Sequence, residues 1–111
     1  LLAGRRATCH WAYTRLLPLV GARHEDARVV EDGNLITAGG VTSGVDFALT
    51  LIAREAGEDM ARAIQLALEY DPAPPFPGGT PATSGAAVTG RLKARVYDEA
   101  AEAMRAVLEQ L

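Results

Sequence analysis

The sequence has a single cysteine and only two histidines. Cys9 cannot form an internal disulfide, which fits a reducing compartment. His10 and His24 are widely separated in the sequence, so together with one cysteine they cannot build a zinc-type ligand framework. We therefore expect no metal site.

Long apolar runs and basic clusters are also missing. No run of apolar residues approaches the roughly 20 that span a bilayer, and the N-terminus lacks the basic-then-apolar order of a signal peptide. Lys and Arg total 11 against 14 acidic residues, the net charge is −3, and the longest basic run is Arg5-Arg6. A membrane segment and a nucleic-acid partner are therefore disfavoured, and we expect a cytoplasmic protein.

What the sequence does contain is an apolar strand, Leu35 to Ala38, that runs through Gly39-Gly40 into a helix beginning near Ser43. Glycines let the backbone bring bare N–H groups close to a ligand, and a helix N-terminus favours negative charge. Ser43 is predicted as the N-cap, with Asp46 in capping-box position. The helix that follows has almost no polar face and should end at Gly57, so we expect a core helix buried against a sheet.

The segments before this stretch predict strands and one short helix. A strand is expected over Arg6 to His10 and a helix from Tyr13 to Val20, with Pro18 in its first turns. Two β-branched runs, 28–31 and 34–37, flank Asp32-Gly33 and predict a β-hairpin with that dipeptide as its turn.

The segments after it predict helices and one loop. A second helix should begin at Glu58-Asp59, with an apolar stripe formed by Met60, Ala63, Ile64, Ala67 and Leu68. The range 71–79 has four prolines and predicts a loop with Phe76 as an aromatic anchor. From Ala86 the chain should be helical to its end, with a seam of Tyr97, Ala101, Met104, Leu108 and Leu111 that packs on the parent domain rather than in a coiled coil.

This element order indicates an α/β fold within one domain of 111 residues, or part of one. Three strands, of which two form a hairpin, are too few to cover a helix that is apolar all round. The first residues, 1–4, have the pattern of a helix's last turn closed by glycine. We therefore expect that part of the domain precedes this chain.

Four blocks of the sequence carry a family resemblance: residues 7–11 (ATCHW), 29–46 (VVEDGNLITAGGVTSGVD), 63–66 (AIQL) and 69–76 (EYDPAPPF). Together they resemble the C-terminal half of the ThiJ/PfpI family, with its class I glutamine amidotransferase-like fold, in the isonitrile hydratase branch. The resemblance implies that residues 1–111 are the C-terminal part of a single domain with a flavodoxin-like three-layer α/β sandwich, usually a homodimer. It also implies an enzyme without a cofactor that adds water to an isonitrile, its small-molecule substrate, to give an N-substituted formamide.

The family's nucleophilic cysteine and the acid that assists it belong to the N-terminal half, so the resemblance implies a lyase only when that half is present. The chain as it stands should be inactive, and we expect self-association or association with the missing half. Cys9 also departs from the family, which usually carries Thr before the histidine.

The resemblance implies that His10 is a supporting catalytic residue beside the cysteine, and that a pocket wall is formed by Trp11, Gly39, Gly40, Val41, Thr42 and Ser43. A capped strand-to-helix turn would explain the same residue types without a ligand. Cys9 is expected to be a buried thiol, because on a strand its neighbour His10 points to the other face. His24 is expected to be solvated surface.

Other activities remain open on the same resemblance. Ligand-sensing domains of AraC-type transcription regulators are closely similar, although in those proteins a helix-turn-helix follows, and the chain ends at Gln110-Leu111 without a basic recognition helix. A protease, glyoxalase or chaperone activity of the ThiJ/PfpI family is the third reading, because one fold supports many functions.

Overall fold

The structure is a computed structural model that describes residues 1–111. Its N-terminal part contains two short parallel strands, β1 (Arg6–Ala7) and β2 (Arg23–His24), joined through a 3₁₀ helix, η1 (Thr14–Val20). The strand predicted over Arg6 to His10 is therefore shorter than expected, because residues 8–10 have left the ladder. Pro18 lies inside η1 rather than in its first turn. Proline lacks an N–H and crowds the preceding turn. Pro18 therefore explains why η1 is a 3₁₀ helix rather than a regular α-helix.

The predicted hairpin forms from β3 (Val29–Asp32) and β4 (Leu35–Ala38), which pair antiparallel with Asp32 opposite Leu35. Its loop is therefore Gly33-Asn34, one residue later than predicted. Gly33 takes the positive φ of 64° that the tight turn needs, and Asp32 stays in the ladder. The Asp32 carboxylate accepts the Arg6 backbone N–H at 2.8 Å, which holds the pKa of Asp32 below its ordinary value. The hairpin is thus tied to β1.

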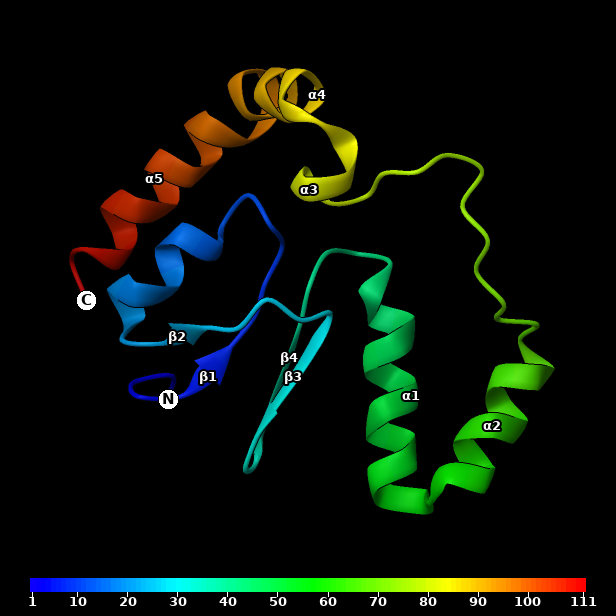
Figure 1. Ribbon diagram of the computed structural model, residues 1–111. Coiled ribbons are helices and arrows are strands. Elements are labelled where there is room, and N and C mark those ends of the chain that lie inside the picture. Colours follow the sequence, from blue (N-terminus) through cyan, green and yellow to red (C-terminus); the bar gives the residue numbers. More distant parts are fainter.

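Helix α1 (Ser43–Ala56) ends at Gly57 as predicted, and α2 (Glu58–Ala67) follows at once. Figure 1 shows α1 beside the hairpin and α2 turning back along α1. The expectation of a buried core helix is wrong for this chain. Ser43 is the only buried residue of α1, and Leu51 is 39% exposed. A two-stranded hairpin and one helix are too narrow to enclose an apolar helix, so the shortage of cover expected from the sequence is present.

The apolar stripe predicted on α2 is mostly uncovered. Ala61 is the buried residue of the helix and Ile64 is half-buried, whereas Met60, Ala63, Ala67 and Leu68 are exposed. Ala61 lies one position from the predicted stripe. The main packing partner of α2 is α1, and α2 turns only a narrow face toward it.

A long segment without helix or strand, 70–80, leads from α2 to the C-terminal helices (Figure 1). Its predicted anchor, Phe76, is 78% exposed, so that expectation is wrong, since no element lies over the segment there. A one-turn helix that the sequence did not predict, α3 (Pro81–Ser84), follows, because Thr80 caps it with its side chain. Helix α4 (Ala86–Leu92), a π-helical turn η2 (Lys93–Tyr97) and α5 (Asp98–Leu108) then complete the expected C-terminal helix.

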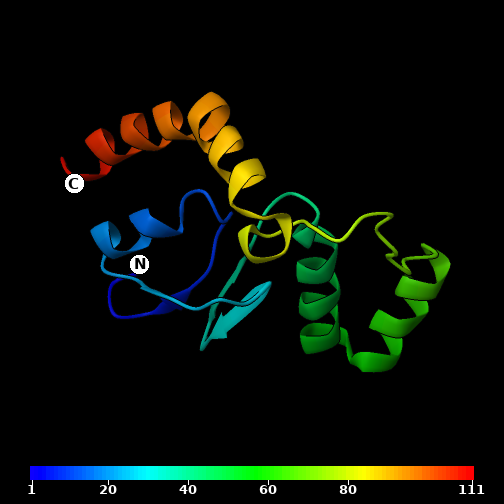
Figure 2. The ribbon, with the colours of Figure 1, turned by 45° about the horizontal axis from the view of Figure 1, so that its top comes forward.

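Helix α5 packs on η1, as Figures 1 and 2 show from two directions. Of the predicted seam, Ala101 is buried, Tyr97 and Leu108 are half-buried, and Met104 and Leu111 are exposed. The seam therefore packs on the parent chain as predicted, over part of its length.

The chain is flat and open. Its extents are 43 × 36 × 18 Å and its radius of gyration is 16.0 Å, against about 13 Å for a compact domain of this length. It exposes 7810 Å², whereas a folded monomer of 11.7 kDa typically exposes about 5,900 Å². The architecture is α/β with a hairpin and five α-helices. None of these helices has the length and apolar composition needed to cross a membrane.

Candidate functional site

A groove of about 710 Å³ lies where four segments that are distant in the sequence meet. Its lining comes from the ranges 8–14, 24–28, 39–43 and 79–82. Four of the residues predicted to form a site line it: Trp11, Gly39, Gly40 and Ser43. The other three, His10, Val41 and Thr42, lie beside the groove but do not line it. The strand-to-helix turn and the segment after β1 therefore meet in space, about 30 residues apart in sequence.

The His10 imidazole is enclosed by three aromatic rings. The ring centroids of Trp11, Tyr13 and Tyr97 lie 5.3, 5.7 and 5.0 Å from its own. The Ala12 N–H donates to His10 Nδ1 at 3.3 Å, so in the neutral ring Nε2 carries the proton. The edge of the ring rests on Gly40, where an added Cβ would lie 2.8 Å from Cδ2. His10 is therefore held in one orientation against the glycine turn.

Tyr97 belongs to this cluster although the sequence pattern assigned it only to a helix seam. It sits at the end of the π-helical turn η2, and its ring also meets Trp11 edge-on at 5.2 Å. Turns of this type disturb the helical period and redirect side chains. A regular helical spacing of three and four residues therefore could not reveal that Tyr97 contacts His10.

The turn between β4 and α1 is closed by Ser43 in a way that differs from the prediction. The Ser43 hydroxyl donates to the Gly40 carbonyl, and the Ser43 backbone N–H donates to the same oxygen at 2.8 Å. The residue in N-cap position is Thr42, whose side chain makes no capping bond. Ser43 as N-cap and Asp46 as its capping-box partner are thus wrong, because each side chain has another partner. Val41 points away from the turn and is 96% exposed.

Asp46 instead joins three segments. Its carboxylate forms an ion pair with Arg28 and accepts a hydrogen bond from the Tyr70 hydroxyl at 3.1 Å. The hydrogen bond to Asp46 raises the pKa of Arg28, and Arg28 also donates to Thr42 Oγ1 at 3.4 Å. This network fixes the start of α1 to the polar side of the groove and to the end of α2.

Cys9 lines the groove but has the properties of an unreactive thiol. Its sulfur lies 3.5 Å from the His10 carbonyl oxygen, and burial raises the pKa of the thiol. A protonated thiol is a poor nucleophile near neutral pH. His24 is exposed, as expected, and also lines the groove.

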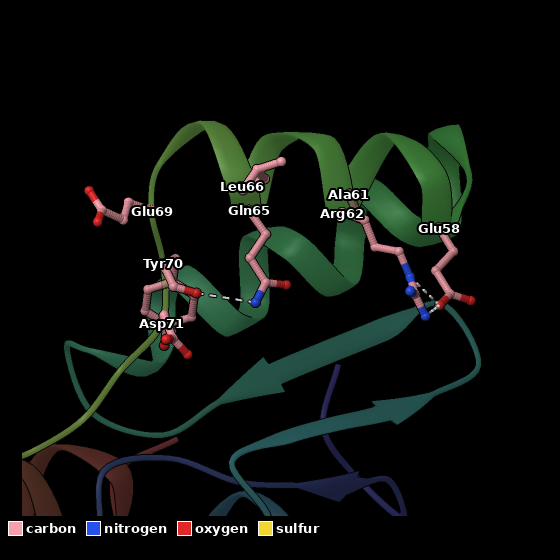
Figure 3. Close-up of a pocket in the computed structure, with 8 residues that line it drawn as sticks. All are labelled: Glu58, Ala61, Arg62, Gln65, Leu66, Glu69, Tyr70 and Asp71. Atoms are coloured by element: carbon pink, nitrogen blue, oxygen red, sulfur yellow. Dashed lines mark hydrogen bonds and ion pairs between the residues drawn. The ribbon is translucent and has the colours of Figure 1, made fainter.

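A second hollow lies on the outer face of α2 and contains none of the predicted site residues (Figure 3). Part of its polar lining is paired: Arg62 Nε donates to Glu58 at 2.8 Å, and Gln65 donates to the Tyr70 carbonyl at 3.2 Å. Glu58, Ala61, Arg62, Gln65, Leu66, Glu69, Tyr70 and Asp71 line it. Because this hollow includes none of the predicted site residues, the first groove remains the candidate site.

The fold matches solved structures closely. A ThiJ/PfpI family protein from Pseudomonas syringae superposes with a TM-score of 0.82 at 41% identity, over 92% of this chain and 43% of that chain. The model of the DJ-1/PfpI family matches residues 1–54. The chain belongs to the DJ-1/PfpI family. The resemblance of the four sequence blocks to this family is thereby confirmed, and the neighbouring α/β structures have the flavodoxin-like fold that it implied.

Two further DJ-1/PfpI relatives define the extent of the match. An isonitrile hydratase of Pseudomonas putida is 55% identical over 95 residues, which are 86% of this chain and 42% of that protein. A cysteine-to-alanine mutant of a DJ-1 superfamily protein from Salmonella typhimurium is 42% identical, with a TM-score of 0.53 over 66% of this chain and 38% of that one. The chain spans less than half the length of the relatives it matches.

Proposed function

We propose that residues 1–111 are the C-terminal part of a single ThiJ/PfpI-type domain that hydrates an isonitrile to an N-substituted formamide. The observation that carries this proposal is the 55% identity to an isonitrile hydratase, which extends over 86% of the chain. Within the proposal the protein is a cytoplasmic lyase that needs no cofactor.

Residues in and beside the groove would supply the parts that such a reaction needs from this half of the domain. His10 supports the catalytic cysteine, and its imidazole is already fixed by the aromatic rings around it and by the Ala12 N–H. The substrate contacts are assigned to Trp11 and to the turn residues that line the groove, Gly39, Gly40 and Ser43. Val41 and Thr42, which the resemblance placed in the same pocket wall, lie outside this lining. A small apolar substrate suits this surface, because indole and bare glycine backbone offer little charge.

The nucleophile in this proposal lies outside residues 1–111. Cys9 is the single cysteine, and burial keeps its thiol protonated. A thiolate supplied by the N-terminal half would add to the terminal carbon of the isonitrile. That carbon takes a proton, which gives a thioimidate. Water then adds across the C=N bond, with the hydroxyl on carbon and a proton on nitrogen, and the thiolate leaves as the hydroxyl loses its proton and the formamide carbonyl forms.

Incubation with cyclohexyl isonitrile tests the activity. The protein that carries this chain together with its upstream coding sequence is expected to form N-cyclohexylformamide, detected by mass spectrometry, whereas the 111-residue chain alone is expected to form none. The short chain is the matched control, because it contains the same groove without the proposed nucleophile. Absence of turnover by the longer protein, once shown to be folded, would reject the proposal.

The open shape supports the proposal that another polypeptide covers this chain. The exposed area of 7810 Å² exceeds the typical value by about 1,900 Å². Large apolar side chains on α1 and α2 contribute to the excess, among them Leu51, Met60 and Leu66. Apolar surface of this kind marks an interaction site or promotes association. We assign the covering role to the N-terminal half or to a second copy of the chain.

The 111-residue chain alone is accordingly expected to self-associate. Sedimentation velocity over about 1–100 μM should show a mass above 11.7 kDa that rises with concentration. The protein that includes the upstream sequence serves as the comparison and should give one defined species. A monomer at every concentration, with cooperative thermal unfolding, would contradict the assignment.

A further inference from the structure

The segment Gly79–Ala82 borders the same groove as Trp11 and Gly40, although about 40 residues separate it from the glycine turn. Figures 1 and 2 both place α3 beside the turn between β4 and α1 and near the segment that follows β1. Thr80, Pro81 and Ala82 all contribute to the lining. The sequence pattern predicted only a loop over 71–79 and gave residues 80–82 no role.

The segment has a fixed local shape. The Thr80 hydroxyl accepts the Thr83 N–H at 3.3 Å, and the Thr83 hydroxyl faces the Thr80 N–H at 3.2 Å, which together form a capping box. Gly79 has a φ of 93°, and its N–H donates to Ser84 Oγ at 3.2 Å. Pro81 occupies the first helical position, where its restricted φ already suits the helix. The side chains of residues 81 and 82 are therefore presented by a turn that holds itself together.

The chemistry of the lining differs between the segments that form the groove. Arg28, His24 and Asp26 contribute polar groups from the range 24–28, whereas Pro81 and Ala82 contribute apolar surface from α3. An isonitrile has a reactive terminal carbon at one end and its N-substituent at the other. An alkyl substituent is favoured where apolar side chains remove it from water.

We propose that Pro81 and Ala82 form the part of the site that selects the N-substituent of the isonitrile. This inference rests on the proposed function and deepens it. Ala82 sets the room available, because it is the smallest side chain of this apolar part and a larger one would project from the same rigid turn. Neither residue takes part in the chemistry itself, so the size of the substituent should affect KM more than kcat.

The test uses the protein with its upstream sequence and two substrates, methyl isonitrile and cyclohexyl isonitrile. Ala82→Leu is expected to lower kcat/KM for the cyclohexyl compound about tenfold relative to the methyl compound, mainly through KM, since a few methylene groups in an apolar site discriminate at this level. Ala82→Gly should shift the ratio in the opposite direction. A merely structural role would lower both rates together.

Ala87→Leu is the matched control, because Ala87 is exposed on α4 and does not line the groove. It should leave the ratio of the two substrates unchanged. If the Ala82→Leu variant turns over both isonitriles with the wild-type ratio of kcat/KM values, the role assigned to Pro81 and Ala82 is wrong while the proposed function stands. If the wild-type protein turns over neither isonitrile, the proposed function itself fails.

Discussion

Replacing Gly40 by alanine is expected to destabilise the protein by about 1–3 kcal/mol, the usual penalty for forcing extra atoms into a packed site. The new Cβ would lie 2.8 Å from Cδ2 of His10, which is closer than non-bonded carbon atoms approach each other in real structures. The imidazole cannot swing away freely, because the rings of Trp11, Tyr13 and Tyr97 surround it and Nδ1 accepts the Ala12 N–H. The φ of Gly40 is not positive, so the effect is steric and not a matter of backbone strain.

Thermal unfolding and tryptophan fluorescence together check this prediction. Trp11 is the only tryptophan, and its ring lies 5.3 Å from that of His10, so a displaced imidazole should change its emission in the folded state. Gly44→Ala is the matched control, since a Cβ at Gly44 meets nothing within 4 Å. Within helix α1 that substitution should stabilise by up to about 1 kcal/mol. Equal stability and unchanged emission in the Gly40 variant would show that His10 is not held against the turn.

The sequence predicted the path of the backbone around the site better than it predicted the contacts. Helix α1 starts at Ser43 and ends before Gly57 as expected, because glycine and the apolar run mark both ends. The roles of Ser43 and Asp46 were not predictable from local pattern. Arg28 and Tyr70 reach Asp46 from segments 18 and 24 residues away, and such partners outweigh a capping box that spacing alone suggests.

In the candidate site, too, some contacts could be predicted from the sequence and others could not. The resemblance brought His10 and the glycine turn into one hypothesis, and the structure places Gly40 directly against the His10 ring. Tyr97 and the segment 79–82 could not be added from the sequence, because a π-helical turn and a one-turn helix set their positions. Neither element leaves a periodic signal long enough to recognise.

Burial was the least predictable property, because it depends on what lies across from a residue. The hydrophobic run in α1 predicted a buried helix, yet in this chain only the hairpin and α2 pack against it. Buried residues number ten of 111, and the largest buried cluster consists of Ala7, Leu17 and Ala22. Stability within the chain therefore depends on a few small contacts around η1.

Leu17→Ala is accordingly expected to remove a large share of the stability, about 2–5 kcal/mol, because it deletes most of a buried side chain and leaves a cavity. Leu17 is 9% exposed and packs in the cluster with Ala7 and Ala22, next to half-buried Cys9. For a chain of this size the loss corresponds to a fall in Tm of about 10 °C or more, measurable by circular dichroism. Since Cys9 borders the groove, the same variant should also loosen the candidate site.

Leu19→Ala is the matched control, because it separates the effect of lost packing from the effect of changed helix propensity. Leu19 lies in the same 3₁₀ helix and undergoes the same chemical change, but its side chain is 38% exposed, so less than about 1 kcal/mol should be lost. The thiol of Cys9 gives a second measurement, because its alkylation should accelerate in the Leu17 variant and stay slow in the Leu19 variant. Similar Tm values for the two variants would mean that the cluster around η1 does not hold this part of the chain together.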